Sequence, residues 1–239
     1  MKLPPATLAF LLWIPAALES TTTPTTETPD PELAKRLEAS IRRFDPPRDQ
    51  TGVRELFGFA LEAAAANYRP EMVERAFDLA EQMQDRDPTS PTYGNFRWYW
   101  FNEKPVDRNA VEFSMERAVL IWKLYRDRLT PKAKERLERL IALSVEGIRR
   151  HRVGESYTNI FLMKTWNCIA IGEATDRADL ATEGYQMLER WFMHVWESGI
   201  HEYLSPTYYG VDVQCLGLIA RFAGRAEGKR LAELALRLF

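Results

Sequence analysis

The chain has 239 residues, of which 46% are hydrophobic, so it can bury a substantial core and most simply forms one domain. Its formal net charge of −2 argues against a protein that binds nucleic acid or an anionic membrane, because either would usually carry an excess of Lys and Arg. Aromatic residues make up 12% of the chain, and several of the seven Trp lie in expected loops, which is typical either of sugar stacking or of side chains that close helix ends.

The first 30 residues are typical of an export signal followed by a linker. Lys2 supplies the positive start, and residues 6–18 are an apolar run of signal-peptide length, followed by a weak cleavage zone of small residues. Thr and Pro dominate residues 21–30, as in a disordered linker. We therefore assign residues 1–20 to a signal peptide, 21–30 to the linker and 31–239 to the folded domain. We expect a secreted or periplasmic protein with no membrane contact beyond its signal.

A short helix is expected over residues 31–43, and from Gly52 onward one helical pattern recurs about every 50 residues. An aromatic, polar loop leads into a helix that is apolar around most of its circumference, and a tight turn then leads into an amphipathic helix. Asp176 and Asp179 resemble a capping box at the start of one amphipathic helix. The apolar helices are expected over 52–67, 107–127, 158–174 and 206–224, and the amphipathic helices over 71–86, 132–151, 177–197 and 228–239.

This alternation predicts an all-α fold in which apolar helices form an inner layer and amphipathic helices an outer layer. The loops are long at one end of the helices and short at the other, which favours an (α/α) toroid over a solenoid with short loops on both sides. About four to five antiparallel hairpins are visible. Because the pattern stops inside a helix, we expect an incomplete toroid that is truncated at its C-terminus. Its open edge would expose apolar surface and favour self-association.

Cys168 and Cys215 both lie in expected apolar helices. In an exported protein they could form a disulfide, but two buried thiols that act as small hydrophobic side chains are favoured. The chain has three His and no Cys and His spacing typical of zinc ligands, so we expect neither a metal site nor a cofactor.

Three loops, at residues 91–105, 152–158 and 198–210, each precede an apolar helix. Every second loop of an antiparallel helix stack lies at the same end, so the three loops are expected to share one rim. The N-termini of the apolar helices would give this rim a positive potential and favour an acidic ligand such as a uronic-acid chain. The opposing interpretation is that Glu and Asp residues of the same loops neutralise this end. The expected substrate-binding residues are Asn95, Arg97, Trp98, Trp100, Asn102, Arg108 and Tyr157.

The loop at 198–210 carries the residues most suited to proton transfer. His201 is near several tyrosines; a histidine titrates near neutral pH, and a phenol can serve as acid or base. Removal of the proton next to a uronate carboxylate requires a group that neutralises the carboxylate, a base, and an acid for the leaving oxygen. Asn159, His201 and either Tyr208 or Tyr209 could supply these groups. Alternatively, His201 stabilises the loop and the tyrosines pack on the helix ends.

The order Thr158-Asn159 followed, one hairpin later, by residues 198–201 (SGIH) and Tyr209-Gly210 resembles the α/α-toroid polysaccharide lyases. This group includes chondroitin, hyaluronan and alginate lyases and heparinase II/III-type enzymes. The aromatic segment 95–100 is similar to their substrate-stacking Trp loop. The resemblance covers about residues 93–217 and implies that Asn159 neutralises the carboxylate, His201 acts as the base and Tyr209 exchanges the proton at the leaving oxygen.

Glu202 supports a second class of enzyme. Inverting glycoside hydrolases on α/α toroids use two carboxylates about 6.5–9.5 Å apart, and Glu103, Asp107 or Asp212 could be the partner of Glu202. A third interpretation is a non-catalytic helical module that binds a glycan or a protein through the aromatic rim. We favour a lyase-like domain that acts by β-elimination on an acidic polysaccharide and binds no nucleic acid.

Overall fold

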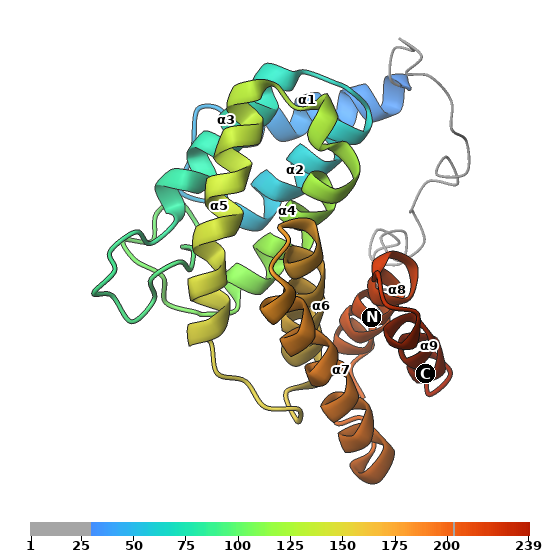
Figure 1. Ribbon diagram of the computed structural model, residues 1–239. Helices are drawn as coiled ribbons and strands as arrows, with labels where there is room; N and C mark the ends of the chain where they lie inside the picture. Colours follow the sequence, from blue (N-terminus) through green and yellow to red (C-terminus); the bar gives the residue numbers. More distant parts are fainter. Residues whose placement is uncertain (1–29, 203) are drawn as a thin grey trace.

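The computed structural model describes residues 30–202 and 204–239, and these residues form nine α-helices with only isolated β-bridges between loops (Figure 1). The predicted all-α class is therefore confirmed. The predicted signal peptide and nearly all of the predicted linker fall on residues 1–29, outside the described residues.

The predicted helices are present, with ends that differ by no more than a few residues. The helices expected to be apolar are α2 (Val53–Ala65), α4 (Ala110–Tyr125), α6 (Thr158–Ala174) and α8 (Pro206–Phe222). The helices expected to be amphipathic are α3 (Pro70–Met83), α5 (Pro131–Arg150), α7 (Ala178–Ser198) and α9 (Ala226–Leu236). Helix α1 (Pro31–Phe44) precedes them, and a short 3-10 helix, η2 (Arg126–Arg128), extends α4.

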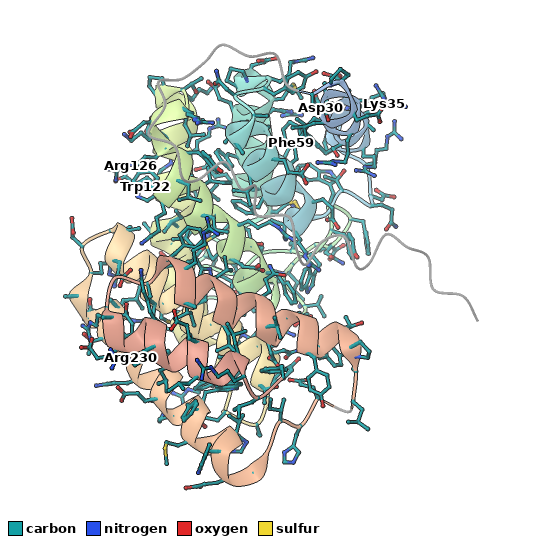
Figure 2. All side chains as sticks on the ribbon, turned by 90° about the vertical axis from the view of Figure 1, so that its right-hand side faces the viewer. Asp30, Lys35, Phe59, Trp122, Arg126 and Arg230 are labelled. Carbon is teal, nitrogen blue, oxygen red and sulfur yellow. The ribbon has the colours of Figure 1, made fainter. Side chains whose placement is uncertain are left out.

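The helices pack in two series, as Figure 1 shows for the upper part of the molecule. In the first series α2 packs on α4, α4 on α6, and α6 on α8. In the second, α3 packs on α5 and α7 on α9, and each of these helices also contacts the helix before it in the chain. Helix α1 packs on α2. Figure 2, turned by 90°, places the α8–α9 hairpin below α2 and α4.

Helix α6 occupies the centre of this packing. Every residue from Thr158 to Gly172 is buried, because α6 contacts α4, α7 and α8 on different sides. Helix α5, in contrast, buries a single stripe that includes Leu137, Leu140 and Ile148. Helix α6, which is apolar all round, therefore lies inside, whereas the amphipathic α5 keeps one face exposed, as their sequences predict.

The starts of α5 and α7 differ in how they are capped. Thr130 caps α5 by accepting a hydrogen bond from the backbone N–H of Ala133 at 3.2 Å. The predicted capping box at α7 is wrong: Arg177 is the N-cap, and Asp176 adopts a left-handed backbone conformation with φ 54°. The carboxylate of Asp179 instead pairs with Arg149 on α5 at 2.7 Å. A short acidic side chain tolerates the left-handed turn, and a long-range ion pair replaces the local cap.

Both cysteines are free and fully buried, which confirms their interpretation as buried thiols. Burial raises the pKa of the Cys168 thiol to about 12 and that of Cys215 well above its usual value. Neither side chain is therefore a reactive thiolate at neutral pH.

Candidate functional site

The three aromatic loops meet at one end of the helices, as predicted. The backbone N–H of Val53, the first residue of α2, donates to the carbonyl of Trp98 at 3.0 Å. Asn109, just before α4, donates through Nδ2 to the hydroxyl of Tyr157, just before α6, at 3.1 Å. The next loop reaches the same end, since Glu202 contacts the start of α6. We call this end the rim. It consists of the N-termini of α2, α4, α6 and α8 and of the described residues 91–105, 152–158, 198–202 and 204–210.

A buried pair of carboxyl groups lies where α6 and α8 begin. Glu202 accepts hydrogen bonds from the backbone N–H of Asn159, at 2.9 Å, and from the hydroxyl of Thr158. The same hydroxyl lies 3.4 Å from Oδ2 of Asp212, which is fully buried and whose Oδ1 has no hydrogen-bond partner. Of the three predicted partners for Glu202, the structure therefore brings Asp212 to it.

The surroundings of Asp212 determine whether its carboxyl group carries a proton. Burial, and secondarily the charge of Glu202, raise the pKa of Asp212 to about 8, so Asp212 is mostly protonated at neutral pH. The hydroxyl of Thr158 has one proton and cannot donate to both carboxyl groups. A protonated Asp212 can donate to Thr158, which then donates to Glu202. Glu202 also lies at the N-terminus of α6, where the backbone N–H of Asn159 points toward it.

The groups predicted to transfer protons differ in exposure. His201 is exposed, and its ring has no hydrogen bond to any residue that the structure describes. Tyr208, in the first turn of α8, is 43% exposed, whereas Tyr209 is half-buried with its ring 5.9 Å from that of Phe239. Asn159 is 4% exposed, and its Oδ1 accepts from the backbone N–H of Ile160. His201 and Tyr208 are therefore accessible at the rim, while Asn159 lies just beneath it.

Most of the predicted binding residues in the loop at 91–105 hold the loop itself together. Arg97 donates to the carbonyl of Asn102 at 2.7 Å and to that of Gln82 at 3.0 Å, and its guanidinium lies over the ring of Trp100. Asn102 in turn accepts from the backbone N–H of Tyr99 through Oδ1. Surrounding protein displaces water from Arg97, which lowers its pKa. These contacts stabilise the loop and leave little of Arg97 for a ligand.

The other predicted binding residues connect this loop to its neighbours. Asn95 is buried and donates through Nδ2 to the carbonyl of Arg108 at 2.8 Å. Trp98 donates through Nε1 to Asp107 at 3.0 Å and packs against Phe113 on α4. Arg108 keeps an exposed guanidinium with one long bond, of 3.3 Å, to a backbone carbonyl.

The aromatic rings exposed on this loop are not the predicted ones. Tyr99 and Phe101 are 40% and 53% exposed and stack with their ring centroids 5.9 Å apart. Trp98 and Trp100 alternate with them and are partly buried. Trp98 lies in a bend, and Trp100 and Phe101 lie in a turn that a hydrogen bond from the backbone N–H of Asn102 to the carbonyl of Tyr99 closes at 3.1 Å. No regular period along the chain therefore predicts which of these rings is exposed.

Sequence reasoning missed a second buried polar cluster, between α4, α6 and the end of α5. Glu112 is fully buried, and its Oε1 lies 3.0 Å from Nδ1 of His151. Lys164 donates to the carbonyl of His151 at 2.7 Å, and Asn167 donates to that of Glu112 at 2.9 Å. Burial raises the pKa of Glu112, and the contact with His151 opposes that rise. The sequence feature that could have predicted this cluster is the presence of one Glu and one Lys within helices that are otherwise mostly apolar.

Among the described residues, no group of three or more His, Cys, Asp or Glu side chains is placed to hold a metal ion. Within the same residues, no helix combines the length and the apolar character that crossing a membrane requires.

The fold and the rim define an all-α protein with two series of packed helices and a set of aromatic, polar loops at one end. Residues 73–238 match the model of a family described as Domain of unknown function (DUF8769), and the chain belongs to this family. No curated protein and no solved structure matches the chain.

Proposed function

We propose that this domain is a lyase-like, carbohydrate-active (α/α) toroid that cleaves an acidic, uronic-acid-containing polysaccharide at the rim by β-elimination. In the toroid, α2, α4, α6 and α8 would form the inner layer and α3, α5, α7 and α9 the outer layer. The observation that carries the proposal is the contrast in exposure at the rim. His201 and Tyr208 are accessible to a polymer, whereas Glu202 and Asp212, which hydrolysis would require, are buried.

The proposed reaction assigns one task to each group. His201 removes the proton next to the uronate carboxylate, and the electrons of that C–H bond form the new double bond as the bond to the leaving oxygen breaks. Tyr209, or Tyr208 beside it, gives a proton to that oxygen. Asn159 would orient the substrate carboxylate through Nδ2, since its Oδ1 is already occupied. The N-terminus of α6 favours the same negative charge.

Glycoside hydrolysis is the second candidate, because Glu202 and Asp212 do meet. The pKa of Asp212, raised to about 8, suits a general acid, and Glu202 would then be the base. Both carboxyl groups, however, lie within hydrogen-bonding distance of the one Thr158 hydroxyl. An inverting mechanism needs about 6.5–9.5 Å between them, with a water molecule in the gap. Their enclosure supports a structural role.

The first prediction is tested with the full chain and a panel of alginate, chondroitin, hyaluronan, heparan and pectate. We expect ultraviolet absorbance from an unsaturated product on one polymer. His201→Ala and Tyr209→Phe should each reduce its rate at least about 100-fold without loss of helical circular dichroism. Glu202→Gln, which keeps an acceptor oxygen for Thr158, should retain turnover and serves as the matched control.

Two other results of these assays would favour the alternative functions. New reducing ends without ultraviolet absorbance, together with an inactive Glu202→Gln and an active His201→Ala, would replace the lyase with the hydrolase. Polymer binding with neither product would indicate a non-catalytic glycan-binding module.

A further inference from the structure

Two arginines on adjacent helices, Arg54 on α2 and Arg117 on α4, have no acidic partner in direct contact. Neither guanidinium makes a hydrogen bond or an ion pair with a described residue. Nη1 of Arg117 is buried and lacks any hydrogen-bond partner. Buried donors are nearly always satisfied in folded proteins, so an unsatisfied one on a charged group calls for a partner.

The two arginines lie close to each other and to the rim. The guanidinium of Arg54 lies over the ring of Phe113, 4.7 Å from its centroid, and Trp98 of the rim packs on that same ring. Gly58 on α2 has no side chain, and a Cβ built there would be 3.8 Å from Nε of Arg117. Arg117 therefore extends from α4 to the surface of α2, in the direction of Arg54.

The two guanidinium groups influence each other electrostatically. Surrounding protein displaces water from the guanidinium of Arg54 and lowers its pKa, and the positive charge of Arg117 lowers it further. Two like charges this close repel each other, and a bound anion relieves that repulsion.

The nearest acidic groups do not contact the two arginines. Glu116 on α4 is 2% exposed, and its carboxylate accepts a hydrogen bond from Gln214 on α8. Glu116 and Glu55 influence Arg54 only by longer-range attraction. Among the described residues, the guanidinium donors of Arg54 and Arg117 therefore have no fixed acceptor.

We infer that Arg54 and Arg117 form a subsite that binds the carboxylate of a uronic acid residue in the polymer that the rim accepts. Guanidinium groups bind carboxylates through paired N–H donors, which a single ammonium group cannot do. The subsite deepens the proposed function and rests on it for the identity of the polymer. Phe113 fixes Arg54 in place, and the link through Trp98 connects the subsite to the rim.

The direct test observes the Nε–H signals of Arg54 and Arg117 by NMR in the full chain, assigned by comparison with Arg54→Gln and Arg117→Gln. Glucuronate should shift both signals, and each variant should weaken its binding at least about tenfold. Arg126→Gln, at the start of η2 just beyond α4 and near Trp122 (Figure 2), removes the same charge and should bind glucuronate like the wild type.

Two further titrations identify what the subsite recognises. Glucose, which has no carboxylate, should leave both signals unchanged. Inorganic sulfate and phosphate should bind at least about tenfold more weakly than glucuronate. Equal binding of inorganic anions, or no response to glucuronate, would overturn the inference.

Turnover separates failure of the subsite from failure of the proposed function. On the polymer that gives an unsaturated product, Arg54→Gln and Arg117→Gln should raise KM at least about tenfold and leave kcat within about threefold, because the subsite binds but does not react. Unchanged KM in both variants would overturn the subsite and leave the lyase intact. Glucuronate shifts without any turnover would support the subsite and reject the lyase.

Discussion

Asp212 shows how strongly one buried residue depends on its surroundings. Its carboxyl group is fully enclosed beside Glu202, and the protonated form is favoured because a second buried negative charge would be costly. In that form it completes a chain of hydrogen bonds through Thr158 to Glu202. The proton on Asp212 therefore adds one hydrogen bond to those that Glu202 accepts from Thr158 and Asn159.

Asp212→Asn should change how stability depends on pH. The pKa is about 8 when folded and about 3.9 when unfolded, so the folded state holds more protons between these values. The stabilisation is full below about pH 4 and is lost as pH rises through 8. Asp212→Asn should lack this pH dependence. The difference in free energy of unfolding between wild type and variant should therefore change by about a few kcal/mol over this range. Urea unfolding at pH 5, 7 and 8.5 measures it.

The exposed Asp127 supplies the control, since Asp127→Asn should keep the wild-type slope. Parallel stability curves for the wild type and Asp212→Asn would show that Asp212 is ionised in the folded protein at neutral pH.

At the scale of elements, Glu112 and His151 connect α4 to the end of α5, and Lys164 of α6 donates a hydrogen bond to the carbonyl of His151. His151→Ala leaves the carboxyl group of Glu112 buried without the one side-chain hydrogen-bond partner that it has among the described residues. We expect a loss of about 3 kcal/mol in the free energy of unfolding, measured by urea denaturation at pH 7. His201→Ala, which removes an exposed ring, should change it by less than about 0.5 kcal/mol. Equal losses would show that the pair does not hold the helices together.

The close contact between α6 and α7 depends on a glycine. A Cβ at Gly184 would lie 2.7 Å from the backbone nitrogen of Ile169, so Gly184→Ala must push the two helices apart. We expect a loss of about 2 kcal/mol. Gly217 on α8 has no atom within 4 Å of the same position, and Gly217→Ala should stabilise the protein by about 0.5–1 kcal/mol. Thermal unfolding of both variants checks the pair, and a shift of the same sign would contradict it.

At the scale of the whole molecule, the sequence predicted the features that depend on the local pattern of apolar and polar residues. The unbroken apolar run predicted the bounds Thr158–Ala174 for α6, and the alternation of apolar and amphipathic helices predicted the all-α class. The meeting of the loops followed from counting antiparallel helices. Each of these features needs only the period of hydrophobic residues along the chain.

What the sequence could not predict depends on contacts between distant elements. Asp179 pairs with Arg149 and not with its own helix, and Glu112 finds His151 thirty-nine positions away. Trp98 is turned inward by Asp107 and Phe113, a choice that no local pattern specifies. Self-association through an open toroid edge and export from the cell stay predictions.

The burial of α6 predicts the order in which the molecule loses protection against hydrogen exchange. Helix α6 is buried on all sides by α4, α7 and α8, so its amides open only when those contacts break together. Helix α1 buries one stripe against α2 and is further held by bonds of Glu38 to Tyr68 and Arg69, so it can detach with the loss of few contacts. Exchange followed by mass spectrometry at pH 7 should therefore find peptides of 158–174 the slowest and those of 31–44 among the fastest. If both segments exchanged at one rate, the chain would open as a single cooperative unit, and the central position of α6 would not govern its local stability.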